Sequence, residues 1–277
     1  VLDGSASSVG LAIQAIAFQR HKIYLDSGGY SSAFVGKNCT PTTVQFVPST
    51  RGLSVAGLSG VVAKGLDSWF FITADYAFGH ALQRDATETI EKQGGKVVGA
   101  ALHPLGTSDY SAYMIQAQAS KAKGLALANA GGDLVNAIKQ AHEFGLTSSM
   151  QLVGLLVLSA DINAIGPKYA EGFQFSTTTY AAESPETLAW SRRFMKLRGG
   201  RAPTDIHVMN YVAMLHWLKA VQAAGTLDTD KVMAKMHEMP VNDIFVHNAP
   251  IRADGRLMAD LTIVRVKPAS AVTDPLD

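Results

Sequence analysis

Short apolar runs alternate with segments of helical spacing along most of this chain. The run from Trp69 to Thr73 is the clearest, because five largely apolar residues in succession predict a strand buried on both faces of a parallel sheet. After a polar turn, apolar residues recur at helical spacing at Phe78, Leu82, Ala86 and Ile90. The pattern therefore predicts a strand followed by a helix that packs back onto it.

The same order repeats between residues 50 and 177. Further strands are predicted over residues 97–101, 125–128, 152–158 and 173–177, and helices over residues 53–64 and 109–122 and from Leu134 to a stop at Gly145. Gly94 and Gly95 are predicted to stop the helix that follows the first strand. Repeated strand–helix alternation predicts an α/β protein with a doubly wound parallel sheet.

A second lobe is predicted from the two ends of the chain. Its strands are expected over residues 23–25 and 44–47, after a helix whose apolar face carries Val9, Ala12, Ile13, Ile16 and Ala17. Helices over residues 185–197, 206–224 and 229–239 are expected to return and cover this sheet, and short strands are expected over residues 246–266. We therefore expect two doubly wound parallel-sheet lobes joined by a multi-crossing hinge, with residues 1–48 and 181–246 in lobe 1 and residues 49–180 and 247–277 in lobe 2.

Polar, glycine-rich segments follow several of the predicted strands. They are the turn before the first helix with Ser7 and Ser8, the segment Gly28 to Ser32, the turn at Asp75 and Tyr76, and residues 129–133. Ligands of open α/β sheets bind beyond the carboxyl ends of the strands, so these segments predict a cleft for a small polar molecule. Two readings stay open at single positions: a serine here can simply cap a helix, and Tyr76 can be a half-buried loop aromatic rather than a ligand contact.

Composition excludes several function classes. The 277 residues are 47% hydrophobic and 17% charged, with a formal net charge of +1 and no basic stripe for nucleic acid. No apolar run approaches the roughly 18 residues that span a bilayer. Cys39 is the only cysteine, and the eight histidines form no metal-binding spacing, so we expect neither metal nor cofactor. Phosphate-loop, dinucleotide and nucleophile-elbow motifs are also absent, so we do not expect an enzyme.

Six segments in collinear order resemble one known family. They are DGSASS, IYLDSGGYSS, FFITADYAFG, ALANAGGD with KQAHEFGL, YAEGF and IRADGR. Together they resemble the periplasmic solute-binding proteins of branched-chain amino acid (leucine/isoleucine/valine-type) ABC transporters, which have the type I periplasmic binding fold. The resemblance runs from residue 1 to about residue 268. Family members have a further stretch before the first segment, so the resemblance implies that lobe 1 is incomplete at its N-terminus here.

The resemblance implies a function and a set of contacts. A small ligand with a carboxylate, an amino acid or an aromatic or organic acid, is expected between two lobes that close over it by a hinge motion. An ABC permease is the implied membrane partner, and the periplasm is the implied location. Carried over position by position, the ligand contacts in lobe 1 are Ser7, Ser8, Gly29, Tyr30 and Ser31, and those in lobe 2 are Tyr76, Asn129, Ala130 and Gly131.

One departure from the family bears on the ligand. Where amino-acid binders carry acidic residues against the ligand ammonium, this chain has Ser54 and Leu156. An ammonium buried without a counter-ion is costly, so we expect an organic acid without a free α-amino group. Two alternatives remain: a ligand-sensing domain of a receptor or regulator with the same fold, and an enzyme.

Overall fold

The structure is a computed structural model that describes residues 1–274 and 276, without the side chain of residue 37. The chain forms two compact units, each of which is described by itself. Unit 1 contains Val1–Ser49, Thr178–Leu261 and the C-terminal residues from Thr273, and unit 2 contains Thr50–Thr177 and Thr262–Val272.

A four-stranded parallel sheet forms the centre of unit 2. Its order is β4-β3-β5-β6. The strands are β3 (Ser68–Ala74), β4 (Lys96–His103), β5 (Gly124–Ala128) and β6 (Gln151–Gly154). Every residue of β3 is buried, as the continuous apolar run predicts for a central strand. The α/β class with parallel sheets is therefore confirmed.

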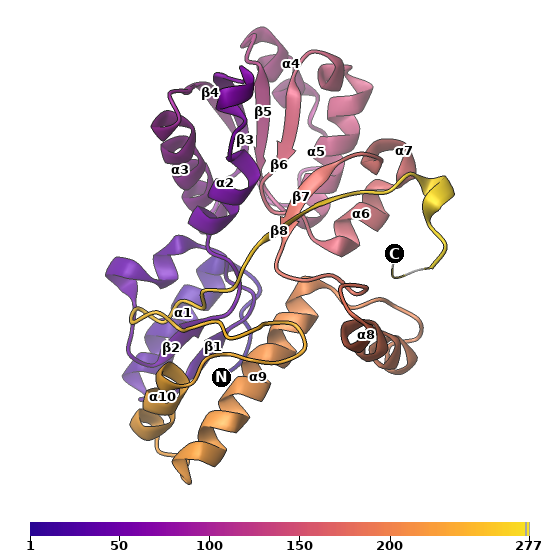
Figure 1. Cartoon of the computed structure of the whole chain (residues 1–277). Helices are drawn as coiled ribbons and strands as arrows, with labels where there is room; N and C mark the ends of the chain where they lie inside the picture. Colours follow the sequence, from indigo (N-terminus) through magenta and orange to yellow (C-terminus); the bar gives the residue numbers. More distant parts are fainter. Residues whose placement is uncertain (275, 277) are drawn as a thin grey trace. The chain divides into compact units, whose positions relative to one another are not determined.

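Helices cover both faces of this sheet (Figure 1). Their bounds are α2 (Thr50–Leu58), α3 (Ala77–Lys92), α4 (Ser111–Ala119), α5 (Gly131–Glu143), α6 (Ser159–Ile165) and α7 (Pro167–Ala170). Alternate residues of β3 and β5 pack with α4 and α5 in one core cluster, which includes Phe70, Ile72 and Leu127. Gly94 adopts a left-handed φ of 86° just past α3, as predicted for the helix stop.

Several elements of unit 2 differ from the sequence prediction. The β6 ladder ends at Gly154 rather than at residue 158, and α2 ends at Leu58, before Gly60 in a left-handed conformation and the 3-10 helix η3 (Val62–Lys64). The expected last strand, β7 (Gln174–Thr177), pairs antiparallel with β8 (Thr262–Arg265) in a separate sheet. That partner comes from the end of the chain, and local pattern carries no information about such a distant pairing.

Unit 1 has a shorter parallel sheet. It contains β1 (Tyr24–Asp26) and β2 (Thr43–Gln45), and Leu2 forms an isolated parallel bridge with Leu25. Its helices are α1 (Ser7–Gln19), α8 (Pro185–Leu197), α9 (Asp205–Ala224) and α10 (Thr229–Glu238), with the 3-10 helices η1 (Ser32–Phe34) and η2 (Gly36–Asn38). Further 3-10 helices in unit 2 are η4 (Leu146–Ser148) and η5 (Ala269–Ala271). The ring of His216 on α9 lies 6.3 Å from that of Phe46, so α9 covers the end of β2.

The buried face of α1 is not the apolar face that the sequence predicts. Val9 and Ile16 are 53% and 58% exposed, whereas Gly10 and Gln14 are buried together with Ala17. A Cβ at position 10 would lie 2.7 Å from a carbon of the Phe34 ring, so only glycine permits this close approach. Gln14 donates from its amide to the Phe34 carbonyl at 3.0 Å, which satisfies the polar group on the buried face.

The segment of residues 247–261, which precedes β8, does not follow the expected division of the chain into two lobes. Residues 247–261 belong to unit 1, although we expected residues from 247 onward in lobe 2. Gln45 explains this, because its N–H donates to Gly255 O at 2.9 Å and its carbonyl accepts from Leu257 N at 3.0 Å. The segment therefore extends the edge of the β1–β2 sheet at β2.

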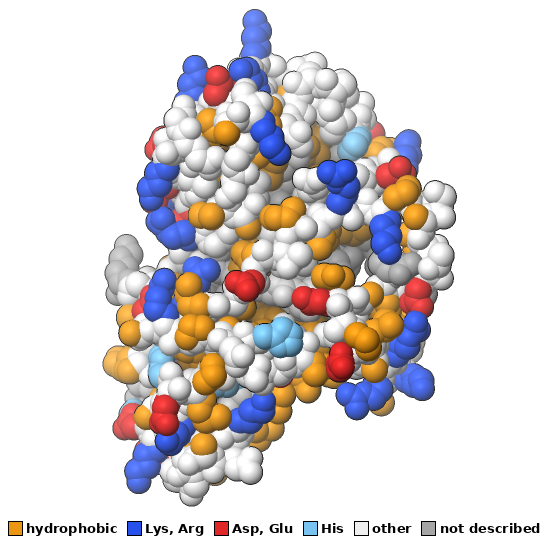
Figure 2. Space-filling model, in the orientation of Figure 1, with side chains coloured by type: hydrophobic (Ala, Val, Ile, Leu, Met, Phe, Trp, Pro, Cys, Tyr) orange, Lys and Arg blue, Asp and Glu red, His pale blue; other side chains and the backbone are white. Residues whose placement is uncertain are grey.

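Acidic and basic side chains are interspersed over the face of the molecule in Figure 2, without a continuous patch of one sign. In the described part of the chain, no helix is both long enough and apolar enough to cross a membrane.

Candidate functional site in two strand-end faces

The loop after β1 in unit 1 is joined to the first turn of α1. The backbone N–H of Ser31 donates to the Ser7 hydroxyl oxygen at 3.1 Å, and the Ser31 hydroxyl accepts from Ala33 N at 3.1 Å. Both serines are at most 2% exposed. Each hydroxyl therefore acts as an acceptor toward the protein, and among the described residues neither hydroxyl proton has an acceptor of its own. The pair can donate two hydrogen bonds to an anion.

The start of α1 adds backbone donors to this pair. The helix begins at Ser7 with Ala6 as its N-cap, and no side chain caps it, so the alternative reading in which Ser7 or Ser8 caps this helix is wrong. The N–H groups of a first helical turn have no partner within the helix, and the positive end of the helix dipole lies there. Ser8 is the second residue of this turn and its side chain is exposed.

Two buried side chains, Asp26 and Gln45, form hydrogen bonds with the backbone of this loop. Asp26 Oδ1 accepts from Gly29 N at 2.8 Å and from Gly28 N at 3.4 Å. The Gln45 amide nitrogen donates to the carbonyls of Gly29 at 2.7 Å and Ser31 at 3.1 Å. The predicted contact Gly29 therefore uses both of its backbone polar groups inside unit 1, and its carbonyl retains one lone pair for a ligand. The aromatic Tyr30 between these residues is 5% exposed.

Glycine is required at position 29 for steric reasons. A Cβ there would lie 2.5 Å from the Phe34 ring and 2.8 Å from Asp26 Oδ1. The segment thus runs directly over the Phe34 ring, and a larger residue would displace the backbone that positions Ser31.

In unit 2 the predicted contacts gather at the ends of two neighbouring strands. Thr73 of β3 is in register with Ala128 of β5, so Tyr76 and Asn129 follow at the same edge of the sheet. Tyr76 is the N-cap of α3, and its ring lies 5.8 Å from that of Phe78. Burial, with a smaller contribution from the charge of Asp133, raises the pKa of Tyr76 to about 12. Its hydroxyl is consequently a neutral hydrogen-bond donor at physiological pH.

Asn129 is fully buried and belongs to a polar network that the sequence analysis missed. Its Nδ2 lies 3.2 Å from His103 Nε2, and the Nδ1 atom of His103 lies 2.9 Å from the Pro104 carbonyl. Since a carbonyl can only accept, Nδ1 carries the proton and Nε2 accepts from Asn129. Asn129 Oδ1 is buried and has no hydrogen-bond partner among the described residues. Nothing in the sequence around His103 indicates that it hydrogen-bonds to Asn129, which lies 26 residues further along the chain.

The first turn of α5 provides the remaining predicted contacts. Ala130 is its N-cap with extended backbone, and Gly131 has φ 58°, a left-handed conformation that favours glycine. A Cβ at Gly131 would meet nothing within 4 Å, so backbone geometry rather than crowding requires the glycine. Asp133 on the same turn accepts from Gly106 N at 3.2 Å through Oδ2, which ties this carboxylate to a neighbouring loop.

Ser54 and Leu156, where the family's amino-acid binders are expected to carry acidic residues, are uncharged and lie in unit 2. Ser54 is fully buried on α2, and its hydroxyl donates to the Thr50 carbonyl one turn earlier at 2.7 Å. Leu156 is 6% exposed and follows β6.

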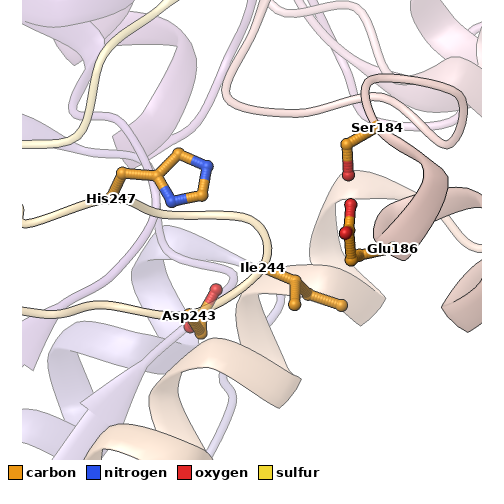
Figure 3. A pocket seen from close by; sticks show the side chains of 5 residues that line it. All are labelled: Ser184, Glu186, Asp243, Ile244 and His247. Atoms are coloured by element: carbon orange, nitrogen blue, oxygen red, sulfur yellow. The ribbon is translucent and has the colours of Figure 1, made fainter.

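Two surface hollows of unit 1 lie outside this set of residues. One of about 350 Å³ is lined by Leu197, Arg198, Gly199 and Arg201. The other, of about 290 Å³, is lined by Ser184, Glu186, Asp243, Ile244 and His247, and Figure 3 shows Glu186 directed toward Ser184. Asp243 Oδ1 already accepts from Phe245 N and Val246 N. No group of three or more potential metal ligands occurs in residues 1–274 and 276.

Comparison with known proteins assigns the family. A family model described as periplasmic binding protein matches residues 1–271, and the chain belongs to this family. None of the curated protein sequences compared with the chain matches it.

Solved structures agree with this assignment. A periplasmic binding protein from Burkholderia mallei is 38% identical with a TM-score of 0.95, over 100% of this chain and 74% of that chain. A branched-chain amino acid ABC transporter periplasmic ligand-binding protein from Burkholderia xenovorans LB400 is 27% identical with a TM-score of 0.85, over the same shares. A solute-binding protein of an ABC transporter from Rhodopseudomonas palustris BisB5, in complex with 3,4-dihydroxybenzoic acid, is 19% identical with a TM-score of 0.84, over 96% and 74%, and shares the fold. The chain is thus a type I periplasmic binding protein, and its structural neighbours include substrate-binding proteins of ABC transporters.

Proposed function

We propose that this protein captures a small carboxylate-bearing solute for an ABC importer. The serine loop of unit 1 (Ser7, Ser8 and residues 29–31) would hold the carboxylate, and the strand-end residues of unit 2 (Tyr76 and residues 129–131) would contact the rest of the solute. Family membership and the 27% identical binding protein of an ABC transporter support the solute-binding role. Export to the periplasm, hinge closure and delivery to a membrane permease are parts of the same proposal.

The observation that carries the proposal is the arrangement of two hydroxyl donors at a helix start. Ser7 Oγ accepts from Ser31 N and Ser31 Oγ accepts from Ala33 N, so both hydroxyl protons are directed away from these donors. The free N–H groups of the first turn of α1 add to them. Oriented donors at the positive end of a helix favour an anion, and a carboxylate accepts several hydrogen bonds at once.

We further propose that the ligand is an organic acid without an α-amino group. An ammonium requires a carboxylate partner when it is buried. Ser54 and Leu156 offer none, and Asp133 is already engaged by Gly106 N. An aromatic acid also suits Tyr76, because its ring can stack on a second ring. A branched-chain amino acid such as leucine is the alternative ligand, and the description of the 27% identical relative as a branched-chain amino acid ABC transporter protein favours this class.

Calorimetric titration tests both levels of the proposal. The panel is benzoate, 4-hydroxybenzoate and leucine, with benzamide as the matched neutral analogue of benzoate. We expect benzoate-type acids to bind and benzamide to fail, since benzamide keeps the ring and lacks the charge. Tight binding of leucine would overturn the organic-acid assignment, and failure of every carboxylate in the panel would overturn carboxylate capture itself.

A further inference from the structure

A buried carboxylate lies directly behind the serine loop of unit 1. Asp26 is 0% exposed, and its Oδ1 accepts three hydrogen bonds: from Gly28 N, from Gly29 N and, at 3.2 Å, from the Tyr24 hydroxyl. Its other oxygen, Oδ2, is buried and has no partner among the described residues. A proton can therefore reside on Oδ2 without displacing any of the bonds that hold the loop.

The same loop links this carboxylate to the proposed ligand contacts. Gly29 is bonded through its N–H to Asp26 and through its carbonyl to Gln45, which also bonds the carbonyl of Ser31. Ser31 in turn donates to Ser7. The position of the Ser31 hydroxyl thus depends on the Gly28 and Gly29 N–H groups, which Asp26 holds by hydrogen bonds.

Resting on the proposed function, we propose that Asp26 is a positioning residue of the serine loop and that it takes up one proton when an anionic solute binds there. Two carboxylates that share a poorly solvated region repel each other, and protonation of the buried one removes the repulsion. The solute carboxylate keeps its charge because the serine hydroxyls and helix N–H groups stabilise it. The Asp26 proton comes from solvent and binds at Oδ2.

The surroundings of Asp26 place its titration in the physiological range. Burial, which is the largest cause, raises the pKa of this carboxyl to about 7, against the lowering effect of the Gly29 and Gly28 N–H bonds, while Asp3 adds a smaller raising effect. Among the described residues, Tyr24 and Asp3 are the titratable groups that act on it. Burial raises the pKa of Tyr24, which stays neutral. Gln45 on β2, in register with Asp26, is uncharged.

Titration of the whole chain with benzoate at several pH values tests the coupling. The affinity is expected to fall as the pH rises above about 7, by up to about tenfold per pH unit for one linked proton. Calorimetry in buffers of different ionisation enthalpy should show proton uptake near neutral pH. Asp26→Asn keeps an acceptor for Gly28 N and Gly29 N, and it should bind benzoate with little pH dependence and no proton uptake. Asp230→Asn, an exposed aspartate of the same unit, should retain the wild-type slope.

A ligand-free measurement keeps the proposal testable if Asp26→Asn does not fold. The amide resonances of Gly28 and Gly29 in the wild-type protein should titrate together near pH 7. Their pH independence would overturn the positioning role, and carboxylate binding without proton uptake would overturn the coupling while leaving the proposed function in place. Binding of no carboxylate at all, with the glycine titration intact, would instead overturn the proposed function.

Discussion

Ser31 donates its backbone N–H to the hydroxyl oxygen of Ser7 at 3.1 Å, which ties the loop after β1 to the first turn of α1. This bond makes the Ser7 oxygen an acceptor toward the protein, so its hydroxyl proton remains available to a ligand. The relationship turns two serines that are 24 residues apart into one donor pair, and the predictions on ligand binding depend on it.

Replacing Ser7 by alanine should weaken benzoate binding about tenfold or more. The variant loses one hydroxyl donor to a charged ligand, worth about 1.5–3 kcal/mol, and it leaves the buried Ser31 N–H without its acceptor. Calorimetric titration measures the affinity, and Ser148→Ala, at an exposed serine, is the control that should bind as the wild type does. Unchanged affinity in Ser7→Ala would contradict the role of the donor pair.

Gly29→Ala should destabilise the protein by about 1–3 kcal/mol. Its Cβ would lie 2.5 Å from the Phe34 ring, closer than non-bonded carbons approach, so either the ring or the loop must move. Gly132→Ala is the matched control, because nothing lies within 4 Å of its Cβ and alanine favours a helix by about 1 kcal/mol over glycine. Urea unfolding should give a lower free energy of unfolding for Gly29→Ala than for Gly132→Ala. Equal values would show that the loop moves to accommodate the Cβ without loss of stability.

Asn129→Ala should lower stability as well as ligand affinity. The substitution removes the donor to His103 Nε2 in a fully buried network, at a cost of about 1–3 kcal/mol. Asn136→Ala removes a partly buried asparagine that donates to the Thr107 carbonyl at a longer 3.3 Å, and it should cost less. Thermal unfolding compares the two. A fully stable Asn129→Ala variant with weakened binding would make this residue a ligand contact without a structural role.

The raised pKa of Asp26 predicts a specific pH dependence of stability. Its pKa is about 7 in the folded protein against 3.8 for an unperturbed aspartate. Between these values the unfolded chain releases the proton while the folded protein keeps it. The stability contributed by this group is therefore complete below about pH 4 and is lost as the pH rises to about 7, by at most about 1.4 kcal/mol per pH unit.

Urea unfolding of the wild type and of Asp26→Asn across pH 4–8 isolates this contribution. The free energy of unfolding of the wild type minus that of the variant should fall across the window, because other groups titrate equally in both proteins. A difference that rises with pH would mean that the carboxylate is stabilised in the folded protein, and it would contradict the account of Asp26.

Tyr76→Ala should weaken benzoate binding more than Tyr76→Phe does. Phenylalanine keeps the ring and its contact with Phe78 and loses only the hydroxyl, whereas alanine also removes the aromatic surface, worth about 0.5–1.5 kcal/mol for a ring pair. Tyr180→Phe, at an exposed tyrosine, is the control for hydroxyl loss. Titration of all three variants with benzoate decides whether Tyr76 contacts the ligand. Wild-type affinity in both Tyr76 variants would mean that Tyr76 is a loop aromatic without a ligand contact.

Much of the fold of unit 2 could be predicted from sequence, because its strands are short runs of continuous apolar residues. Ser68–Ala74 is buried along its whole length, as the run from Trp69 to Thr73 predicts for a central strand. The face of α1 could not be predicted by counting apolar residues. There a glycine and a glutamine are buried and two apolar side chains are exposed, since close approach to the Phe34 ring decides the packing.

The candidate site could also be predicted only in part. Segment composition located Ser7, Ser31 and Tyr76 at strand ends, and the structure brings Ser7 and Ser31 into contact within unit 1. The supporting side chains Gln45 and His103 were missed, because a single polar residue in or beside an apolar strand has no periodic signal. Their roles arise from partners 14 to 26 residues away along the chain.

A crystal structure of the protein with benzoate tests the central claim most directly. The account predicts carboxylate oxygens within hydrogen-bonding distance, about 2.5–3.2 Å, of the hydroxyls of Ser7 and Ser31, with the ring against Tyr76. Density for benzoate elsewhere, or a carboxylate that touches neither serine, would contradict it.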